Sequence, residues 1–273
     1  MIGFDAILGN VRGKAPLVHN ITNYVTANDC ANILLACGAS PIMADEPDEV
    51  EEITARCDGL TVNMGTLNRR KIPAMLRAGA RANELGRPVL LDPVGAGASS
   101  LRAETAAALL DRLQFAVVRG NVSEIRALTQ GTRAARGVDA GAAEHSAGSD
   151  GVTALAKALA RKSGAVVAVT GPTDIISDGA RVCAVANGHA MLGKITGAGC
   201  MLSAMTTAFV AANPAEPFEA VCAAVIAMGL CGELAHARLG PLDGSGSYRA
   251  YLIDAVYNLT AQQLKDGANY EMR

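Results

Sequence analysis

The sequence predicts a three-layer α/β/α protein, in which a mostly parallel central sheet carries helices on both faces. Short runs of β-branched residues alternate with helical patterns of about 10 to 15 residues, as in βαβ units. Half of the residues are hydrophobic, whereas aromatic residues make up only 3% and Trp is absent. The core must therefore be built from small aliphatic side chains, which layered α/β proteins allow. Because nothing in the composition marks a seam, we expect one domain over residues 1–273.

The first clear patterns lie between residues 18 and 52. Residues 18–26 form a predicted polar loop that leads into an apolar-faced helix, and Gly38 ends that helix. A short apolar piece over 39–44 follows. The acidic run over 45–52 is most simply the solvated start of a helix, because carboxylates favour helix N-termini.

Regular alternation of strands and helices begins at residue 59. Strands are predicted at 59–65, from 87 to an end at Asp92 before a Gly-rich loop, at 115–120 and at 165–170, and helices at 72–85, 102–113, 123–128 and 201–212. Residues 175–185 are expected to form a hairpin with Asp-Gly at its turn. The stretch 131–151 is interpreted as a surface excursion, and the tail over 217–263 as nearly all helix.

Composition excludes several classes of function. A net charge of −2 and a pI near 6.1 leave no electrostatic footprint for nucleic acid. The N-terminus lacks a signal-peptide pattern, and no window is expected to reach the roughly 20 uncharged apolar residues of a membrane span. We therefore expect a cytoplasmic protein without a membrane partner. The seven cysteines include no CxxC pair, so the sequence predicts neither a disulfide framework nor a zinc site.

The segment 194–200 has the pattern of an anion-binding turn. Gly197, Ala198 and Gly199 precede a helical pattern, and the first amides of a helix have no intrahelical partner and lie at its positive end. Cys200 falls in the first helical turn, where that field is expected to lower the pKa of its thiol. The alternatives are a plain tight turn and a small buried hydrophobe.

Polar residues also stand at the ends of the predicted strands. In a parallel sheet these ends share one edge, where ligands bind, so Asn63, Asp92, Arg119 and Thr170 are expected to converge. Asp92 and Glu124 offer hard oxygens of the kind that hold Mg²⁺, and Arg119 offers a fork for phosphate. Each residue also has a structural alternative: a turn cap for Asp92, a first-turn helix acid for Glu124 and a surface ion pair for Arg119.

Seven spaced motifs stand out along the chain: HNITNYVT at 19–26, ASPIMADEP around Met43, VNMGTL at 62–67, LLDPVGAGAS at 90–99, VVRGNVSEI at 117–125, VAVTGPTDIISDG at 167–179 and KITGAGCMLSA at 194–204. Together they make the chain resemble the hydroxyethylthiazole kinases, members of the ribokinase-like superfamily that act in thiamine salvage. The resemblance implies a ribokinase-like kinase domain that transfers phosphate from ATP, with Mg²⁺, to the hydroxyl of 4-methyl-5-(2-hydroxyethyl)thiazole. It also implies a homotrimer with sites at subunit interfaces.

The same resemblance implies roles for individual residues. Asn23, Met43 and Gly197 would contact the thiazole; Arg119, Thr170 and Asn121 the nucleotide; and Asp92 and Glu124 the Mg²⁺–phosphate group. The backbone of 197–199 would form the anion cradle, and Cys200, where superfamily relatives carry Asp, would orient the alcohol or act as a weak base. Ala198 departs from relatives, which often have Thr or Ser there.

Two other readings of the same motifs stay open. A nucleotide-dependent hydro-lyase of this fold would use a similar cradle, but it would be expected to keep an Asp at position 200. A catalytically idle regulator that binds ATP or thiazole would account for the missing acid. A Rossmann dehydrogenase fits least well, because no GxGxxG follows the first predicted strand.

Overall fold

The computed structural model describes residues 2–130 and 149–273. Within them, nine strands form one sheet in the order β2-β1-β3-β4-β5-β6-β7-β8-β9. The strands from β2 to β6 run parallel, and β7, β8 and β9 add antiparallel pairs at one edge. Their bounds are β1 Leu17–Ile21, β2 Ser40–Met43, β3 Gly59–Asn63, β4 Val89–Asp92, β5 Val117–Asn121, β6 Val166–Thr170, β7 Asp174–Ser177, β8 Val182–Val185 and β9 Tyr270–Met272.

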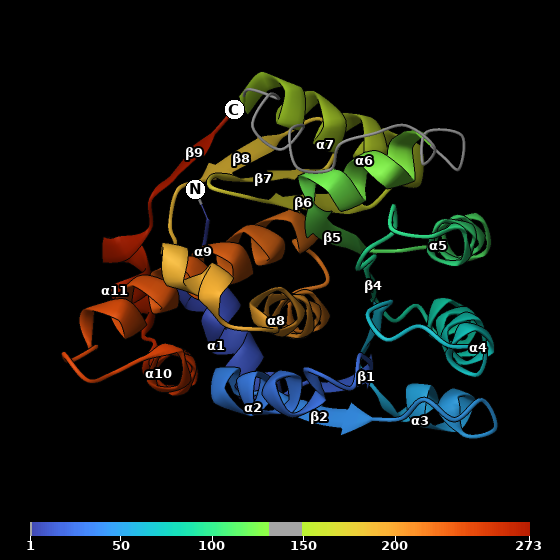
Figure 1. The fold of residues 1–273 in the computed structure, drawn as a ribbon, viewed down its shortest axis with the longest axis horizontal. Coiled ribbons are helices and arrows are strands. Elements are labelled where there is room, and N and C mark those ends of the chain that lie inside the picture. Colours follow the sequence, from blue (N-terminus) through green and yellow to red (C-terminus); the bar gives the residue numbers. More distant parts are fainter. Residues whose placement is uncertain (1, 131–148) are drawn as a thin grey trace.

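Helices cover both faces of the sheet, as predicted (Figure 1). One layer contains α1 Phe4–Lys14, α2 Ala27–Cys37, α8 Ala198–Ala212, α9 Pro217–Ala237, α10 Ser245–Asn258 and α11 Ala261–Gly267, and the short 3-10 helix η2 Ala190–Lys194 precedes α8. The opposite layer contains α3 Val50–Arg56, α4 Lys71–Glu84, α5 Ser100–Arg112, α6 Val122–Gln130 and α7 Ser149–Ser163. Two separate hydrophobic clusters, one under each layer, stabilise the sandwich.

The first strand is the main correction to the sequence interpretation. Residues 18–26 were expected to be a polar loop, but Leu17–Ile21 is β1, the second strand of the sheet. His19 and Asn20 make this strand resemble a loop in the sequence, although both polar side chains are buried and hydrogen-bonded. The two ring nitrogens of His19 lie 2.9 Å from Thr54 Oγ1 and from the Ala44 carbonyl, and Asn20 donates to the Val18 carbonyl.

Most of the other predicted elements lie where the pattern placed them. Gly38, at a φ of +96°, ends α2, and the hairpin turns at Asp178–Gly179 between β7 and β8. The strand β9 and the helices α1 and η2 were not predicted. The predicted excursion over 131–151 falls mostly outside the described residues.

Helix α9 passes through the core. It contains a window of 18 residues with a mean hydropathy of 1.7, which by length and composition alone would be apolar enough to cross a membrane, although Glu219 and Glu233 interrupt the uncharged run. However, 83% of that window is buried inside the fold. Its apolar surface is covered by the sheet and by α8 and α10, which is the position of a core helix in a globular protein.

Candidate active site

The carboxyl ends of the parallel strands converge on one edge of the sheet, as predicted. Asn63 and Asp92 are register partners at the ends of β3 and β4, and Asn121 and Thr170 are register partners at the ends of β5 and β6. The N-terminus of α8 comes to the same edge, because Cys200 contacts Asn63 there. Five segments far apart in the chain therefore meet at one place.

Five buried or half-buried side chains form a hydrogen-bonded group that we call the amide cluster: Asn23, Asn63, Asp92, Cys200 and Ser203. The Nδ2 of Asn23 donates to Asn63 Oδ1 at 3.1 Å and to Cys200 Sγ at 3.2 Å. The Nδ2 of Asn63 donates to Asp92 Oδ2 at 2.7 Å and to Cys200 Sγ at 3.2 Å. Ser203 donates to the same oxygen of Asp92 at 2.9 Å. The cluster links the loop after β1, the ends of two strands and the first turn of α8.

The thiol of Cys200 differs from its predicted state. Burial raises its pKa, and the negative charge of Asp92 raises it further, so the expectation of a lowered pKa at the helix N-terminus is wrong. Hydrogen bonds from Thr26, Asn63 and Asn23 act in the opposite direction but do not compensate. Cys200 is therefore a neutral thiol at physiological pH.

Asp92 is completely buried and only partly hydrogen-bonded. Its Oδ2 accepts two hydrogen bonds, whereas its Oδ1 has no partner within the described residues and lies 3.8 Å from Nη1 of Arg119. Burial raises the pKa of this carboxyl to about 6, while the charge of Arg119 lowers it and that of Glu124 raises it. A buried carboxylate oxygen without a partner is costly for folding and indicates a functional role.

The two glycines at the start of α8 have no room for a Cβ. Gly197 has a φ of +85°, and a Cβ there would lie 2.7 Å from Thr26 Cγ2. A Cβ at Gly199 would lie 2.5 Å from Arg119 Nη1. The Arg119 guanidinium therefore packs against the backbone of Gly199 in the first turn of α8, so a positive charge lies beside the positive end of the helix, where an anion is favoured.

A cavity of about 650 Å³ opens beside this turn. Its walls come from the end of β6, the segment that leads into η2, the first turn of α8 and the middle of α9. The lining residues are Arg119, Thr170, Gly171, Pro172, Asp174, Asn187, Gly188, His189, Ala190, Leu192, Gly193, Ala198, Gly199, Leu202, Val225, Met228 and Gly229.

Four of the residues that the sequence indicated line this cavity. Arg119 and Thr170 face each other, with Nη2 of Arg119 donating to Thr170 Oγ1 at 2.8 Å, and Ala198 and Gly199 form the adjoining wall. Nε of Arg119 is buried without a partner among the described residues. The guanidinium thus has donors to spare for an anionic group.

Asn121 and Glu124 organise the start of α6 instead of lining the cavity. The side chain of Asn121 accepts from Ser123 and from the backbone of Glu124, at 2.7 and 2.9 Å. The two carboxylate oxygens of Glu124 accept the backbone N–H groups of Gly95 and Asn121, both at 2.9 Å. Glu124 therefore ties the Gly-rich loop after β4 to the end of β5.

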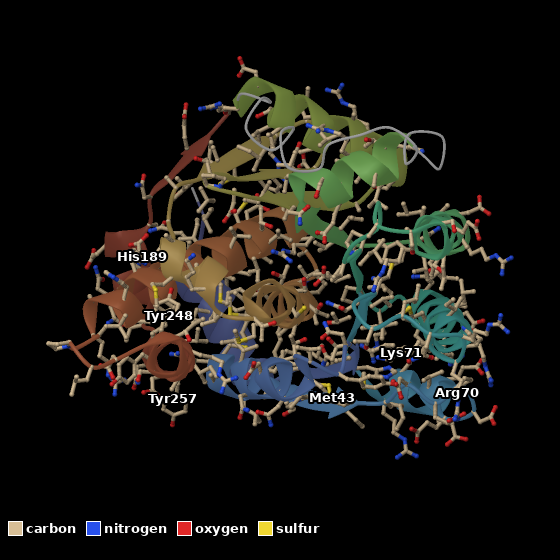
Figure 2. The ribbon with its side chains drawn as sticks, viewed as in Figure 1. Met43, Arg70, Lys71, His189, Tyr248 and Tyr257 are labelled. Atoms are coloured by element: carbon tan, nitrogen blue, oxygen red, sulfur yellow. The ribbon has the colours of Figure 1, made fainter. Side chains whose placement is uncertain are left out.

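Met43 lies apart from the cavity. It ends the edge strand β2 and is 38% exposed. Figure 2 shows it well separated from His189, which lies beside α9. Tyr24 and Val25, in the loop after β1, are 67% and 65% exposed. This part of the chain presents large apolar side chains to its surroundings.

Sequence reasoning missed the wall formed by residues 187–193. The side chain of Asn187 is held by Glu233 and the Gly267 carbonyl, and the ring of His189 stacks on that of His236 at 3.6 Å between centroids. Asp174, at the start of β7, also lines the cavity, and burial raises its pKa to about 6. Asp174 lies in the motif at 167–179 that also contains Thr170, so the sequence could have indicated it as a site residue. Nothing in the local sequence pattern indicated residues 187–193.

The carboxylates of Asp92 and Glu124 are suited to hold a divalent cation that is also bound by a phosphate group. Asp92 Oδ1 is a hard oxygen that accepts no hydrogen bond from the described residues, and Glu124 lies near enough to raise the pKa of Asp92. Within residues 2–130 and 149–273, no group of three or more His, Cys, Asp or Glu side chains could hold a metal by itself. Such a cation would take its remaining ligands from water and phosphate, as Mg²⁺ commonly does.

Comparisons with known proteins agree with this geometry. A sequence model described as the hydroxyethylthiazole kinase family matches residues 8–262. The hydroxyethylthiazole kinase of Clostridium acetobutylicum is 56% identical over 266 residues, which cover 97% of each chain. The chain belongs to the hydroxyethylthiazole kinase family. The alternatives of a hydro-lyase and of an idle regulator are therefore not favoured.

Solved structures extend the agreement to three dimensions. The structure of a hydroxyethylthiazole kinase from Pyrococcus horikoshii is 38% identical, with a TM-score of 0.89 and coverage of 100% of both chains. A ribokinase-like superfamily protein from Enterococcus faecalis is 12% identical, with a TM-score of 0.60 over 91% of this chain and 88% of the other. The second likeness concerns the fold alone, and it confirms the ribokinase-like architecture of this family member.

Proposed function

We propose that residues 1–273 form one kinase domain that transfers the γ-phosphoryl group of Mg–ATP to the hydroxyl of 4-methyl-5-(2-hydroxyethyl)thiazole, giving its phosphate and ADP. One observation carries this proposal: consecutive residues in the first turn of α8 contribute to both the cavity and the amide cluster. Ala198 and Gly199 line the cavity, whereas Cys200 belongs to the amide cluster. A phosphoryl group at the start of α8 would therefore stand between a nucleotide in the cavity and an alcohol at the cluster.

Charge stabilisation accounts for most of the catalysis in this proposal. Negative charge spreads over the transferred phosphoryl group, and little covalent chemistry remains for the protein. The amides of 197–200 and Arg119 would bind that charge, and Gly199 brings the two within contact of each other. Asp92 and Glu124 would hold the Mg²⁺ that shields the phosphates. Thr170 and Asn121 would support the nucleotide end, Thr170 through its bond to Arg119.

Cys200 orients the acceptor alcohol in this scheme. Because burial and Asp92 raise the pKa of its thiol, it does not supply a thiolate at neutral pH. The alcohol keeps its proton until late in a loose transition state, so the reaction needs no strong base. The alcohol would lie near Sγ, with Asn23 and the backbone of Gly197 beside the thiazole.

We further propose that the protein acts as a cytoplasmic homotrimer in which Met43 reaches the site of a neighbouring subunit. The exposed side chains of Tyr24, Val25 and Met43 at the β1–β2 edge support an interface there, because exposed large apolar groups mark contact surfaces. Light scattering of the purified protein tests this. A monomer that retains full activity would contradict it.

The deciding experiment measures ADP release from Mg–ATP with and without the thiazole, with the hydroxymethylpyrimidine alcohol as control. Release that depends on the thiazole supports the kinase and its acceptor together. Folded protein that binds ATP but releases no ADP with either alcohol would withdraw the thiazole assignment. Omission of Mg²⁺ in the same assay tests the metal requirement.

A further inference from the structure

Asn63 occupies the centre of the amide cluster, and no role has been assigned to it so far. It ends β3, is 1% exposed and does not line the cavity. Its Oδ1 accepts from Asn23 Nδ2 at 3.1 Å and from the backbone N–H of Gly65 at 2.9 Å. Its Nδ2 donates to Asp92 and Cys200. Both donors and both acceptor positions of one amide are therefore in use.

The orientation of this amide is determined by its neighbours. A rotation by half a turn would bring its oxygen to within about the same 2.7 Å of the Asp92 carboxylate, and two acceptors would then repel each other. The native orientation directs both N–H groups towards Asp92 and Cys200 and leaves the oxygen for the loop that carries Asn23. A donating half and an accepting half can thus be distinguished in a single side chain.

The donating half decides which oxygen of Asp92 stays available. Asn63 and Ser203 both donate to Oδ2, so Oδ1 is the carboxylate oxygen that lacks a partner within the described chain, on the side of Arg119. The same half holds Sγ of Cys200, which Asn23 also contacts. The Asn63 amide therefore fixes the position of Asp92, on the phosphoryl side of the site, relative to Cys200, on the alcohol side.

We propose that Asn63 is a positioning residue that aligns the acceptor alcohol with the phosphoryl group by orienting Asp92 and Cys200 together. The inference rests on the proposed kinase reaction and deepens it. In-line transfer depends on the placement of the two reacting partners, so a displacement of either one lowers kcat more than it weakens binding. Asn63 itself touches neither substrate in this scheme.

Two substitutions separate the halves of the amide. Asn63→Asp keeps an oxygen for Asn23 and Gly65 but replaces the donor with an acceptor, whereas Asn63→Leu removes both halves at similar size. Asn20→Leu is the matched control, because Asn20 is also a buried amide, 2% exposed, on the adjacent strand β1, and it donates only within its own strand among the described residues. Thermal unfolding of all variants tests whether each is folded. Asn63→Ser replaces an Asn63 variant that is not.

We expect Asn63→Asp to lower kcat about 100-fold, the usual cost of losing one oriented donor, while the thiazole Kd from calorimetry changes by no more than about threefold. Asn63→Leu should lower kcat equally and also weaken thiazole binding about tenfold, since the Asn23 loop is released. Asn20→Leu should leave kcat within about threefold.

A kcat for Asn63→Asp within about threefold of wild type would overturn the proposal and leave Asn63 as a support for the loop. Equal losses in Asn63→Leu and Asn20→Leu would overturn it as well. A wild-type enzyme that releases no ADP with the thiazole would instead refute the kinase reaction on which the inference rests, so the two failures are distinguishable.

Discussion

The amide cluster and the cavity are neighbouring halves of one site, but they are built differently. In the cluster, Asn63 uses all of its hydrogen-bonding capacity and Asp92 is fully buried. The cavity has about 650 Å³ of open space, apolar side chains from α8 and α9, and a buried Arg119 Nε that has no hydrogen-bond partner among the residues that the structure describes. A buried and densely hydrogen-bonded polar network tolerates little change in geometry, whereas a cavity with apolar walls tolerates variation in shape. We therefore expect substitutions in the cluster to act on kcat and substitutions in the cavity to act on nucleotide binding.

The turn that joins the two halves should be the most sensitive position. Gly197→Val adds side-chain atoms where a Cβ already lies 2.7 Å from Thr26, at a φ of +85°. It should close the anion cradle and lower kcat/KM at least about 1000-fold, beyond the loss from one oxyanion donor. Steady-state kinetics with both substrates measures this.

Gly86→Val is the control for backbone strain alone. Gly86 also has a positive φ, +64°, but a Cβ there meets nothing within 4 Å, and it lies before β4, away from the site. Comparable activity losses in the two variants would mean that strain, not closure of the cradle, causes the effect.

The cavity wall can be altered without touching the cluster. In Gly229→Ala, the new Cβ would lie 2.6 Å from the backbone oxygen of Asn187, so α9 and the 187–188 segment must separate. An overpacking cost of about 1 to 3 kcal/mol should raise the KM for ATP about tenfold, with the thiazole Kd unchanged. Gly246→Ala, in α10 with open space around it, is the matched helical control. A weaker thiazole affinity in Gly229→Ala would show that the halves are not independent.

Replacement of the thiol tests the cluster with a smaller expected effect. Cys200→Asp would place a carboxylate where the amides of Asn23 and Asn63 already donate, although the charge of Asp92 opposes it. Turnover should stay within about threefold of wild type or rise, because a base contributes little to a loose transition state. Kinetics beside Cys200→Ser measures it. An inactive Cys200→Asp that still binds ATP would contradict an orienting role for the thiol.

The smallest expected effect is a pH dependence of stability that Asp174, in the cavity wall, causes. Burial raises the pKa of Asp174 to about 6, against the opposing effects of the Gly171 amide and Arg119. Between the ordinary pKa of 3.8 and about 6, the folded protein holds a proton that the unfolded chain has lost, so stability falls as pH rises through this window. Asp174→Asn should remove that fall. Its Tm relative to wild type should therefore increase from pH 4 to pH 6 and then level off. A constant difference would exclude Asp174 as the cause.

Much of the site could be predicted because its residues follow local patterns. Asn63, Asp92 and Thr170 end strands and Arg119 lies two residues before the end of β5, and parallel strands bring such ends together whatever the rest of the chain does. The strand β1 could not be predicted in this way. Its buried His19 is paired with groups distant in the sequence, Thr54 and Ala44, and the polarity of the segment alone resembled a loop.

The sequence by itself determined the alternation of strands and helices, the family, and the glycine turn before α8, because each depends on residues close together in the chain. The tertiary structure decided three further properties: the neutral state of Cys200, the Asp92 oxygen that accepts no hydrogen bond within the described part of the chain, and the cavity wall at residues 187–193. Each of these depends on burial and on charges or hydrogen bonds brought from distant segments, as when Asn63 meets Cys200. The pKa of a thiol responds to that whole environment, which the pattern around one helix start does not contain.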